Sequence, residues 1–512
     1  MRARERHDFA TSRGSRWAPV VLAVGVAIAL RVWVLSTSVG RVDSDEAVVG
    51  LMARSILHGA HPAFYWRQAY GGTLEPLAVA ALFRVFGTSA AALKAVPLAL
   101  GVVAAVLVWR VGRRTIGETA RVAGAVFLVY PPAFVWWSTK ERGFYWVALG
   151  CGLVVLLFAL RLAAQLPSPR PLDAALLGIA LGVGWWTSPQ SMFIAAPAVL
   201  WLILRAGRAI VRCWPAVPAA VLGGLPWIVW NVAHRFASLR QPVPSQSSTY
   251  LHRFRLFFAR LLPTTLGLRR PFSGSWLFGA GGVALYVVAL TAFAAAVFVT
   301  QRELRRGNHH RCEPLVAIAL VYPFLFALPS TSYYVGEPRY GLLLAPIIVL
   351  LVTGAMAARA PLAPLALVVI ASLLAWNTVA FTVDVGKTHA YALDLAPPSL
   401  NGLEHTLDAA GVTRVYADYW IAYPLTFDTK ERIVATPFAS PRSMAFAAKV
   451  EAAAHTTFVV LRGRPQDGAL RTELERRHVS FRRISTGLFE VYFLRSRLAP
   501  SLLATAWAQP SP

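Results

Sequence analysis

The chain has 512 residues, of which 56% are hydrophobic and only 14% charged, against roughly a quarter charged in an average soluble protein. The apolar residues come in separate runs, each long enough to cross about 30 Å of hydrocarbon as a helix. This composition excludes a soluble globular enzyme, a disordered protein and a secreted disulfide scaffold. It predicts a polytopic α-helical membrane protein with the lipid bilayer as its surroundings.

The net charge of +26 comes from 50 Lys and Arg residues against 24 Asp and Glu residues. Such an excess is typical of nucleic-acid-binding proteins. Here, however, the basic residues form short clusters between apolar runs, as expected of loops on the cytoplasmic side of a membrane, so no nucleic-acid partner is expected. The three cysteines, Cys151, Cys213 and Cys312, lack CxxC spacing and indicate neither a disulfide framework nor a zinc site.

In chain order, residues 1–16 form a basic, cytoplasmic N-terminal segment. The apolar run that follows is too long for a signal peptide and has no clear cleavage site, so it is expected to remain as the first span. Together with it, eleven runs are expected to cross the membrane, about 17–36, 90–109, 119–136, 143–162, 172–187, 190–206, 213–231, 276–300, 313–329, 340–358 and 362–382.

Segment 74–87 is ambiguous because it is short and carries Arg84. If it crossed the membrane, the basic cluster at 110–121 would lie outside. If it is an interfacial helix, every short basic loop lies inside, in agreement with the positive-inside rule. We therefore expect a transmembrane region over 17–382 with a cytoplasmic N-terminus. Its first loop (37–89) and its long loop (232–275) are expected on the outer face.

Residues 383–497 differ from the rest in composition and are expected to form a small extracytoplasmic α/β domain, followed by a flexible tail over 498–512. Helix-like and strand-like stretches alternate there. The expected helices cover 399–410, 442–454 and 468–478. The expected strands cover 412–416, 432–435, 457–461, 481–484 and 488–493.

Three carboxylates, Asp43, Asp45 and Glu46, stand within four residues just after the first span. A helical pattern follows them, so Asp43 or Ser44 is expected to cap a helix whose dipole favours acids at its start. The simpler interpretation is an acidic helix start in a solvated loop. The functional interpretation is that a carboxylate at the membrane surface takes a proton from a bound hydroxyl group.

Two further groups of outer residues are candidates for substrate binding. The first outer loop combines aromatic and polar groups suited to carbohydrate, although an interfacial aromatic belt has the same composition. Cations at the outer ends of two spans could hold a phosphate, although Glu141 could simply pair with a neighbouring cation and an interfacial Arg could serve as an anchor. The candidates are Trp66, Gln68, Tyr70 and Glu75 in the loop, and Lys140, Glu141, Arg142, Arg339 and Tyr340 at the span ends.

These features together resemble a known family, the integral-membrane glycosyltransferases of the C structural class, in particular the protein O-mannosyltransferase and aminoarabinose-transferase-like group (glycosyltransferase family 39-like). The resemblance covers roughly residues 17–360 and rests on the order and common sidedness of several short motifs. They are Asp45-Glu46, Phe86-Gly87, Gly112-Arg113-Arg114, GWWTSP at 184–189 and Pro338-Arg339-Tyr340.

The resemblance implies transfer of a hexose or pentose from a polyprenyl-phosphate donor to a glycan, lipid or protein acceptor on the outer face. It places the catalytic base at Asp45. Asp43 and Glu46 would be accessory acids that orient the acceptor or hold a divalent cation where one is used. Ala47 and Val48 stand where the mannosyltransferases carry a His, which leaves metal binding undecided.

The general chemistry of a lipid-linked donor agrees with this expectation. No GxGxxG sequence follows a strand, so no nucleotide cofactor is expected. A single base opposite the departing phosphate predicts inversion at the sugar carbon.

Two alternative functions remain open from the sequence. One is a transporter or flippase of lipid-linked saccharides, disfavoured because charges within spans are few, Arg31 being the clearest. The other is a non-catalytic scaffold of the cell envelope.

Overall fold

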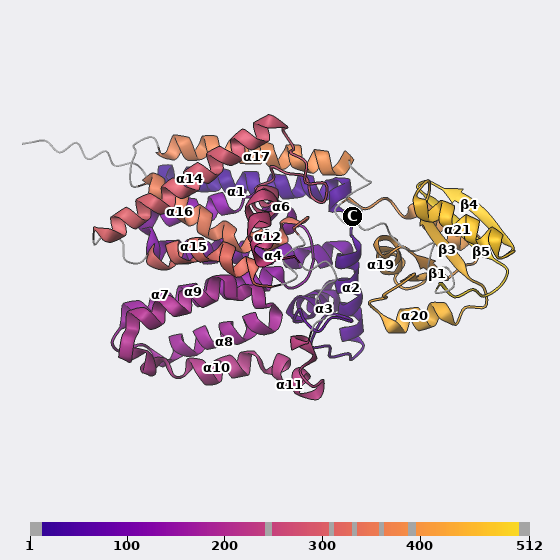
Figure 1. The fold of residues 1–512 in the computed structure, drawn as a ribbon, viewed down its shortest axis with the longest axis horizontal. Helices are drawn as coiled ribbons and strands as arrows, with labels where there is room; N and C mark the ends of the chain where they lie inside the picture. The colour runs from indigo at the N-terminus through magenta and orange to yellow at the C-terminus, as the bar shows by residue number, and fades with distance from the viewer. Residues whose placement is uncertain are drawn as a thin grey trace, which may run out of the picture.

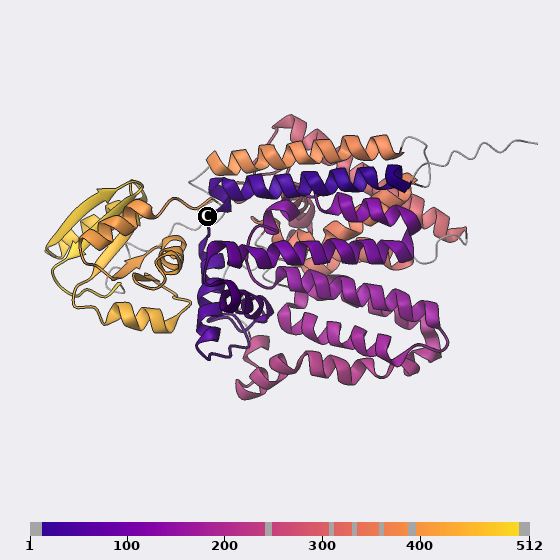
Figure 2. The same cartoon turned by 180° about the vertical axis from the view of Figure 1, so that it is seen from behind.

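A computed structural model describes residues 13–240, 248–306, 312–329, 335–357, 363–387 and 396–500, which form a helical bundle with an α/β domain at one end (Figure 1). Most of the basic N-terminal segment and of the expected tail lies outside the described residues. The view from behind shows the long helices running side by side along one direction (Figure 2). That direction is the expected membrane normal.

The bundle consists of helices that overlap the expected spans, together with two short helices, α12 and α13, in segment 232–275, which was expected to be a loop. They are α1 (Arg13–Ser36), α4 (Ala90–Thr115), α5 (Ala120–Phe127), α6 (Pro132–Trp137), α7 (Tyr145–Gln165), α8 (Pro171–Thr187), α9 (Met192–Ala206), α10 (Ala216–Gly223), α11 (Leu225–Ala233), α12 (Tyr250–Leu256), α13 (Leu262–Thr265), α14 (Ala280–Arg305), α15 (Glu313–Ala327), α16 (Ala345–Ala357) and α17 (Ala363–Lys387).

Within the described residues, five helices are long and apolar enough to cross a membrane, or up to seven if each bent pair is one span. The number of eleven spans therefore stays a prediction. Two expected spans are not continuous helices. Segment 119–136 is divided between α5 and α6, because Pro131 and Pro132 cannot donate backbone hydrogen bonds. Segment 213–231 bends by 59° between α10 and α11, at Gly224.

Two short helices lie across the end of the bundle that faces the α/β domain (Figure 1). After α1 the chain turns by 86° into α2 (Ser44–Leu57), and α3 (Leu74–Phe86) follows beside it. Segment 74–87 is thus a 13-residue helix packed on α2, as expected of an interfacial helix rather than a span.

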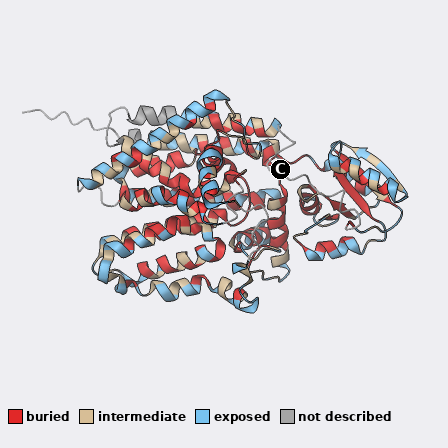
Figure 3. Cartoon of the chain, in the orientation of Figure 1, coloured by how far each residue is buried: buried red, intermediate tan, exposed pale blue. Residues whose placement is uncertain are grey.

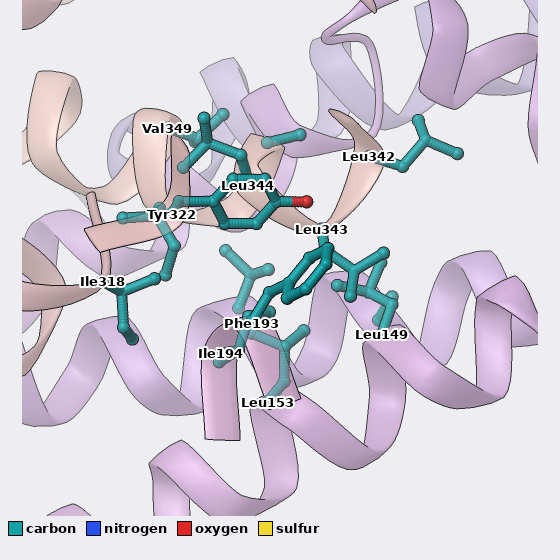
Figure 4. Close-up of a cluster of buried hydrophobic side chains, with 14 of the residues drawn as sticks. Leu149, Leu153, Phe193, Ile194, Ile318, Tyr322, Leu342, Leu343, Leu344 and Val349 are labelled. Atoms are coloured by element: carbon teal, nitrogen blue, oxygen red, sulfur yellow. The ribbon is translucent and has the colours of Figure 1, made fainter. Parts of the chain in front are cut away.

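The interior of the bundle is apolar, and its buried residues lie between the helices (Figure 3). Phe193 of α9 and Tyr322 of α15 pack edge to face, with ring centroids 5.3 Å apart, among leucines from α7 and from the 3₁₀ turn Pro338–Leu344 (Figure 4). The Tyr322 hydroxyl donates to the Tyr340 carbonyl at 2.7 Å. This contact fixes the chain near Arg339, one of the candidate cations.

The α/β domain contains a five-stranded sheet of order β2-β1-β3-β5-β4, in which β1, β2 and β3 are parallel and β5 is antiparallel to both its neighbours. The expected strands are confirmed within a few residues. The elements are α18 (Asn401–Ala409), β1 (Arg414–Ala417), α19 (Tyr419–Asp428), β2 (Val434–Pro437), α20 (Met444–Glu451), β3 (Thr457–Leu461), α21 (Pro465–Arg476), β4 (Phe481–Thr486) and β5 (Phe489–Leu494). Helix α19, which packs on α2, was not predicted from the sequence.

Candidate active site

The site begins at the first turn of α2, where Asp43 caps the helix as expected. Its side chain accepts a hydrogen bond from the Glu46 backbone at 3.1 Å, and the Glu46 carboxylate accepts one from the Asp43 backbone at 3.2 Å. This reciprocal capping box directs both carboxylates toward the bundle. Successive helix residues are about 100° apart, so Asp45 points in a different direction from both of them.

Three cations from other elements surround the two inward acids. Lys94 of α4 donates to Glu46 at 2.6 Å, and Lys140 donates to Asp43 at 3.0 Å and to Glu46 at 3.4 Å. Arg142 contacts one Asp43 oxygen with Nε at 3.2 Å and Nη2 at 2.8 Å. We call these five residues, Asp43, Glu46, Lys94, Lys140 and Arg142, the buried ion cluster.

The side chains of the buried ion cluster are at most 7% exposed, which contradicts the interpretation of a solvated acidic loop. Burial favours the neutral acid and raises the pKa of Asp43, but the charges of Arg142 and Lys140 outweigh it, so the pKa is held well below its ordinary range. Both acids are therefore occupied by fixed cations. The donor set of Asp43 and Glu46 does not suit an additional divalent metal ion.

The side chain of Asp45, unlike the buried side chains of Asp43 and Glu46, is 29% exposed. One of its oxygens accepts a hydrogen bond of 2.6 Å from the hydroxyl of Tyr419, which belongs to α19 of the α/β domain. The other oxygen lies 3.7 Å from Arg142 Nη1. Burial, together with the Asp45 charge, raises the pKa of Tyr419, so this hydroxyl stays protonated and acts as a donor.

A second cation lies beside this group. Arg339 donates to Glu337 at 3.1 Å and stands 5.7 and 5.4 Å from the ring centres of Tyr145 and Tyr340. Glu337 is in turn 3.8 Å from Arg142. The Arg339 side chain is 18% exposed, against 1% for Arg142 and 0% for Lys140. Among these three candidates it is therefore the one most open to a ligand.

Glu75 and Glu141 form a buried carboxyl pair behind the site. Burial raises the pKa of Glu75 to about 7, although a hydrogen bond from Glu141 opposes the rise. Burial, and then the charge of Glu75, raises the pKa of Glu141 well above its ordinary value. Burial therefore shifts both carboxyl groups toward their neutral forms. Glu141 binds Glu46 only through its backbone N–H, at 2.9 Å, and does not pair with its neighbouring cations as the simpler interpretation supposed.

The first outer loop reaches the α/β domain. Trp66 packs edge to face on Phe446 with ring centres 6.0 Å apart. The Gln68 side-chain oxygen accepts from Arg442 at 2.7 and 3.0 Å in the amide orientation that satisfies both partners. Tyr70 is 44% exposed and packs edge to face on Phe144. The structure thus brings Trp66 and Gln68 to the junction between the loop and the domain.

Several site residues were missed from the sequence. Lys94 could have been predicted from the sequence. A single lysine within an apolar run is costly in a membrane unless it pairs with a buried acidic group. Tyr419 and Arg442 lie in a domain whose composition alone gives no hint of a role in the site. Among the residues that the structure describes, no three His, Cys, Asp or Glu side chains are grouped so that they could hold a metal ion.

Comparisons with known proteins concern the sequence family and the fold. Residues 74–230 match the family model of dolichyl-phosphate-mannose-protein mannosyltransferases. The fold is similar to ArnT from Cupriavidus metallidurans in the apo state, with a TM-score of 0.64 and 13% identity over 98% of this chain and 100% of that one.

The same protein bound to undecaprenyl phosphate gives a TM-score of 0.61 and 14% identity over 97% of this chain and 100% of that one. No curated relative matches the sequence significantly. The resemblance drawn from the sequence is confirmed: the chain is a multi-pass membrane protein with the fold of ArnT, and its residues 74–230 match the mannosyltransferase family model.

Proposed function

We propose that the chain is a membrane glycosyltransferase that moves a sugar from a polyprenyl-phosphate donor to an acceptor hydroxyl on the outer face of the cell membrane. The match to a mannosyltransferase family and the fold shared with a protein that binds undecaprenyl phosphate support the donor class. The observation that most directly supports this reaction is the position of Asp45. It is a partly exposed carboxylate 3.7 Å from Arg142, at the same end of the bundle as Arg339.

Asp45 is the proposed general base. Its carboxylate takes the proton of the acceptor hydroxyl while the acceptor oxygen forms a bond to the anomeric carbon of the sugar. The bond from that carbon to the phosphate oxygen breaks at the same time, and its electron pair leaves with the polyprenyl phosphate. Because attack and departure occur on opposite sides, a single displacement inverts the anomeric carbon.

Arg339 is the proposed contact for the leaving phosphate. It is the most exposed of the three candidate cations, and guanidinium groups suit phosphate oxygens. Lys140 has its three donors directed at the Arg41 carbonyl, Asp43 and Glu46. We therefore assign Lys140 and Arg142 to neutralising the inward acids and to making the potential around the phosphate positive.

The remaining candidates receive supporting roles. Tyr70 presents an exposed ring suited to a sugar, Tyr340 is a partly buried ring beside Arg339, and Trp66 and Gln68 line the outer loop at the domain junction. Glu75 and Glu141 are fully enclosed behind Arg142 and the turn that precedes α7. We propose that this carboxyl pair holds the turn in shape and does not contact the sugar.

Arg31, the clearest charge within a span, does not favour a translocation path. It donates to the carbonyls of Ala27 at 3.0 Å and Leu128 at 2.9 Å, where α5 ends. This is the role of a side chain that satisfies backbone groups at a helix break. Transfer, rather than transport, is therefore the function that we propose.

The proposal is tested with purified protein and a panel of undecaprenyl-phosphate-linked hexoses and pentoses, with membrane extract as the source of acceptor. Release of undecaprenyl phosphate and formation of a glycosylated product are measured together. We expect turnover with one or a few sugars, and a loss of at least about 10²-fold in Asp45→Asn. Turnover by no donor, or full turnover by Asp45→Asn, contradicts the proposal.

The proposed orientation is tested separately by cysteine labelling. In a chain without Cys151, Cys213 and Cys312, Leu488→Cys in the α/β domain should react with an impermeant thiol reagent in intact cells. Both Leu488 and Glu118 are exposed, but Glu118→Cys, which follows α4, should react only after the cells are opened. The reverse pattern places the site on the cytoplasmic face and contradicts the proposal.

A further inference from the structure

We propose that Tyr419 is a positioning residue for Asp45, so that the α/β domain completes the active site of the membrane bundle. This inference rests on the proposed function, because it assigns Tyr419 a role in a reaction that depends on Asp45. It goes further in one respect. It gives the α/β domain, whose sequence suggested no role, a direct part in the reaction.

Tyr419 contacts the first turn of α2 at two adjacent residues. Its hydroxyl donates to Asp45 at 2.6 Å, and its backbone carbonyl accepts a hydrogen bond from the Ser44 hydroxyl. Tyr419 is the first residue of α19, where the Asp418 side chain caps the helix by accepting from the Trp420 backbone at 2.9 Å. The residue that contacts Asp45 is therefore itself held at a capped helix start.

The rest of α19 lies close against α2. A Cβ atom on Gly50 would lie 2.4 Å from the ring of Phe427, so only glycine allows this approach. One turn further along α2, Arg54 donates to the Phe427 carbonyl at 3.1 Å and lies 4.8 Å from the centre of its ring. Contacts along the whole length of α2 thus fix where the Tyr419 hydroxyl stands.

Arg442 supports the same ring from the other side. This residue stands just before α20 and is 5.9 Å from the centre of the Tyr419 ring, while its guanidinium also donates to Gln68 of the first outer loop. Tyr419 is therefore partly buried, with contacts both to α2 and to Arg442 of its own domain. Its hydroxyl has little freedom to leave Asp45.

The consequence for Asp45 is a defined orientation. One carboxylate oxygen is held by Tyr419 and the other faces Arg142, so both ends of the carboxylate have a partner while 29% of the side chain stays exposed. A general base is effective only when its oxygen lies within hydrogen-bond distance of the proton that it removes. Without the Tyr419 hydroxyl, the partly exposed side chain of Asp45 would occupy several rotamers.

The test compares two variants that each lose one buried tyrosine hydroxyl of the α/β domain. Tyr419→Phe removes the donor to Asp45, whereas Tyr492→Phe removes a hydroxyl that bonds to Asp467 within the domain. With the undecaprenyl-phosphate sugar that supports turnover, Tyr419→Phe should lower kcat about 10-fold. It should leave KM for the donor and Kd for undecaprenyl phosphate unchanged. Tyr492→Phe should change none of the three.

Hydrogen exchange gives a second measurement that needs no turnover. The peptide containing residues 43–52 should exchange faster in Tyr419→Phe than in the wild type, and at the wild-type rate in Tyr492→Phe. Unchanged exchange and unchanged kcat in Tyr419→Phe overturn the inference. Equal losses in both variants also overturn it, because they indicate a general weakening of the domain.

The failure of this inference is distinguishable from the failure of the proposed function. If Asp45→Asn is inactive while Tyr419→Phe has the wild-type kcat, only the positioning role is wrong. If Asp45→Asn itself is fully active, the proposed function is wrong. In the combined variant, Tyr419→Phe should add no further loss to that of Asp45→Asn, because both changes act on one group. An additive loss overturns the positioning role.

Discussion

The carboxylates on the two faces of the first turn of α2 differ in their burial and in their partners. Toward the bundle, Asp43 and Glu46 are fully buried and paired with Lys94, Lys140 and Arg142. Toward the α/β domain, Asp45 is partly exposed and is held by one neutral hydroxyl. One short acidic motif therefore contains two kinds of acid, and helix geometry separates them because neighbouring residues point about 100° apart.

On the proposed function, this difference keeps a reactive carboxylate beside a stable charge network. The inward acids are already neutralised, so they have no free oxygen with which to remove a proton. The outward acid is partly exposed, and its carboxylate is held by Tyr419 on one oxygen and faces Arg142 of the buried ion cluster with the other. Four predictions test this division, and each sets one variant against a control or a contrasting variant.

The largest effect is expected on the buried side, in Lys140→Met. Removing one partner of a buried ion pair leaves uncompensated charge, which costs about 3–5 kcal/mol of folding stability. The control is Arg432→Met, which removes an exposed cation that pairs with Glu404 and should cost less than about 1 kcal/mol. Thermal unfolding in detergent measures both. Equal stability losses would show that the ion cluster does not hold the bundle together.

The next effect separates the two aspartates. Asp45→Asn should lower the turnover rate by about 10²–10⁴-fold with little change in unfolding temperature, because it removes only a proton acceptor. Asp43→Asn should lower the unfolding temperature, because it removes the negative charge between two buried cations. Turnover and unfolding are measured on the same preparations. If Asp43→Asn is folded and inactive while Asp45→Asn is active, the roles of the two residues are exchanged.

A smaller loss is expected at the cation most open to ligand. Arg339→Ala should lower kcat/KM on the order of 10²-fold, because a fixed charge no longer stabilises the leaving phosphate. Arg339→Lys should recover part of the loss, since it keeps the charge but not the paired N–H geometry. Wild-type kcat/KM in Arg339→Ala, at normal expression, would make this residue an interfacial anchor.

The smallest effect concerns pH and the carboxyl pair. The pKa of Glu75 is raised to about 7 in the fold from an ordinary value of 4.5. The folded state therefore binds the proton more tightly, and this contribution to stability is complete below about pH 4.5 and lost as the pH rises through 7. Between pH 5 and 8 the unfolding temperature should fall.

Glu75→Gln should make that fall shallower. The control is Glu473→Gln. Hydrogen bonds from Arg476 and Arg477 lower the pKa of this partly exposed carboxyl to about 2, so its titration lies below this range. An unfolding temperature that falls equally in wild type and Glu75→Gln would contradict protonation of the pair.

Much of this architecture could be predicted from the sequence. Apolar runs bounded by arginines locate most of the bundle helices, though not α12 and α13, and the alternation after residue 412 locates strands β1 to β5 of the domain. Asp43 as the cap of α2 follows from its place before a helical pattern. These features depend on residues that are close together in the chain. Hydrophobic periodicity and helix-capping residues are therefore enough to predict them.

The rest depends on contacts between distant segments. The sequence does not reveal that Lys140 faces Asp43, or that Glu141 faces Glu75, because either residue could pair with its own neighbours. Helix α19 escaped detection because Pro424 interrupts its pattern, although Asp418 before it is a favourable cap. The Tyr419–Asp45 hydrogen bond joins residues 374 positions apart, and no sequence pattern near either residue predicts it.

The distance along the chain between Asp45 and Tyr419 has a consequence for biosynthesis. A ribosome makes the acids and their buried cations by residue 142, Arg339 much later, and Tyr419 and Arg442 only near the end. Asp45, the proposed base, is thus made long before the residue that holds its carboxylate. On the proposed function, a nascent chain with its first helices inserted would carry Asp45 without its Tyr419 partner, and full activity would begin only when the last domain has folded and docked on α2.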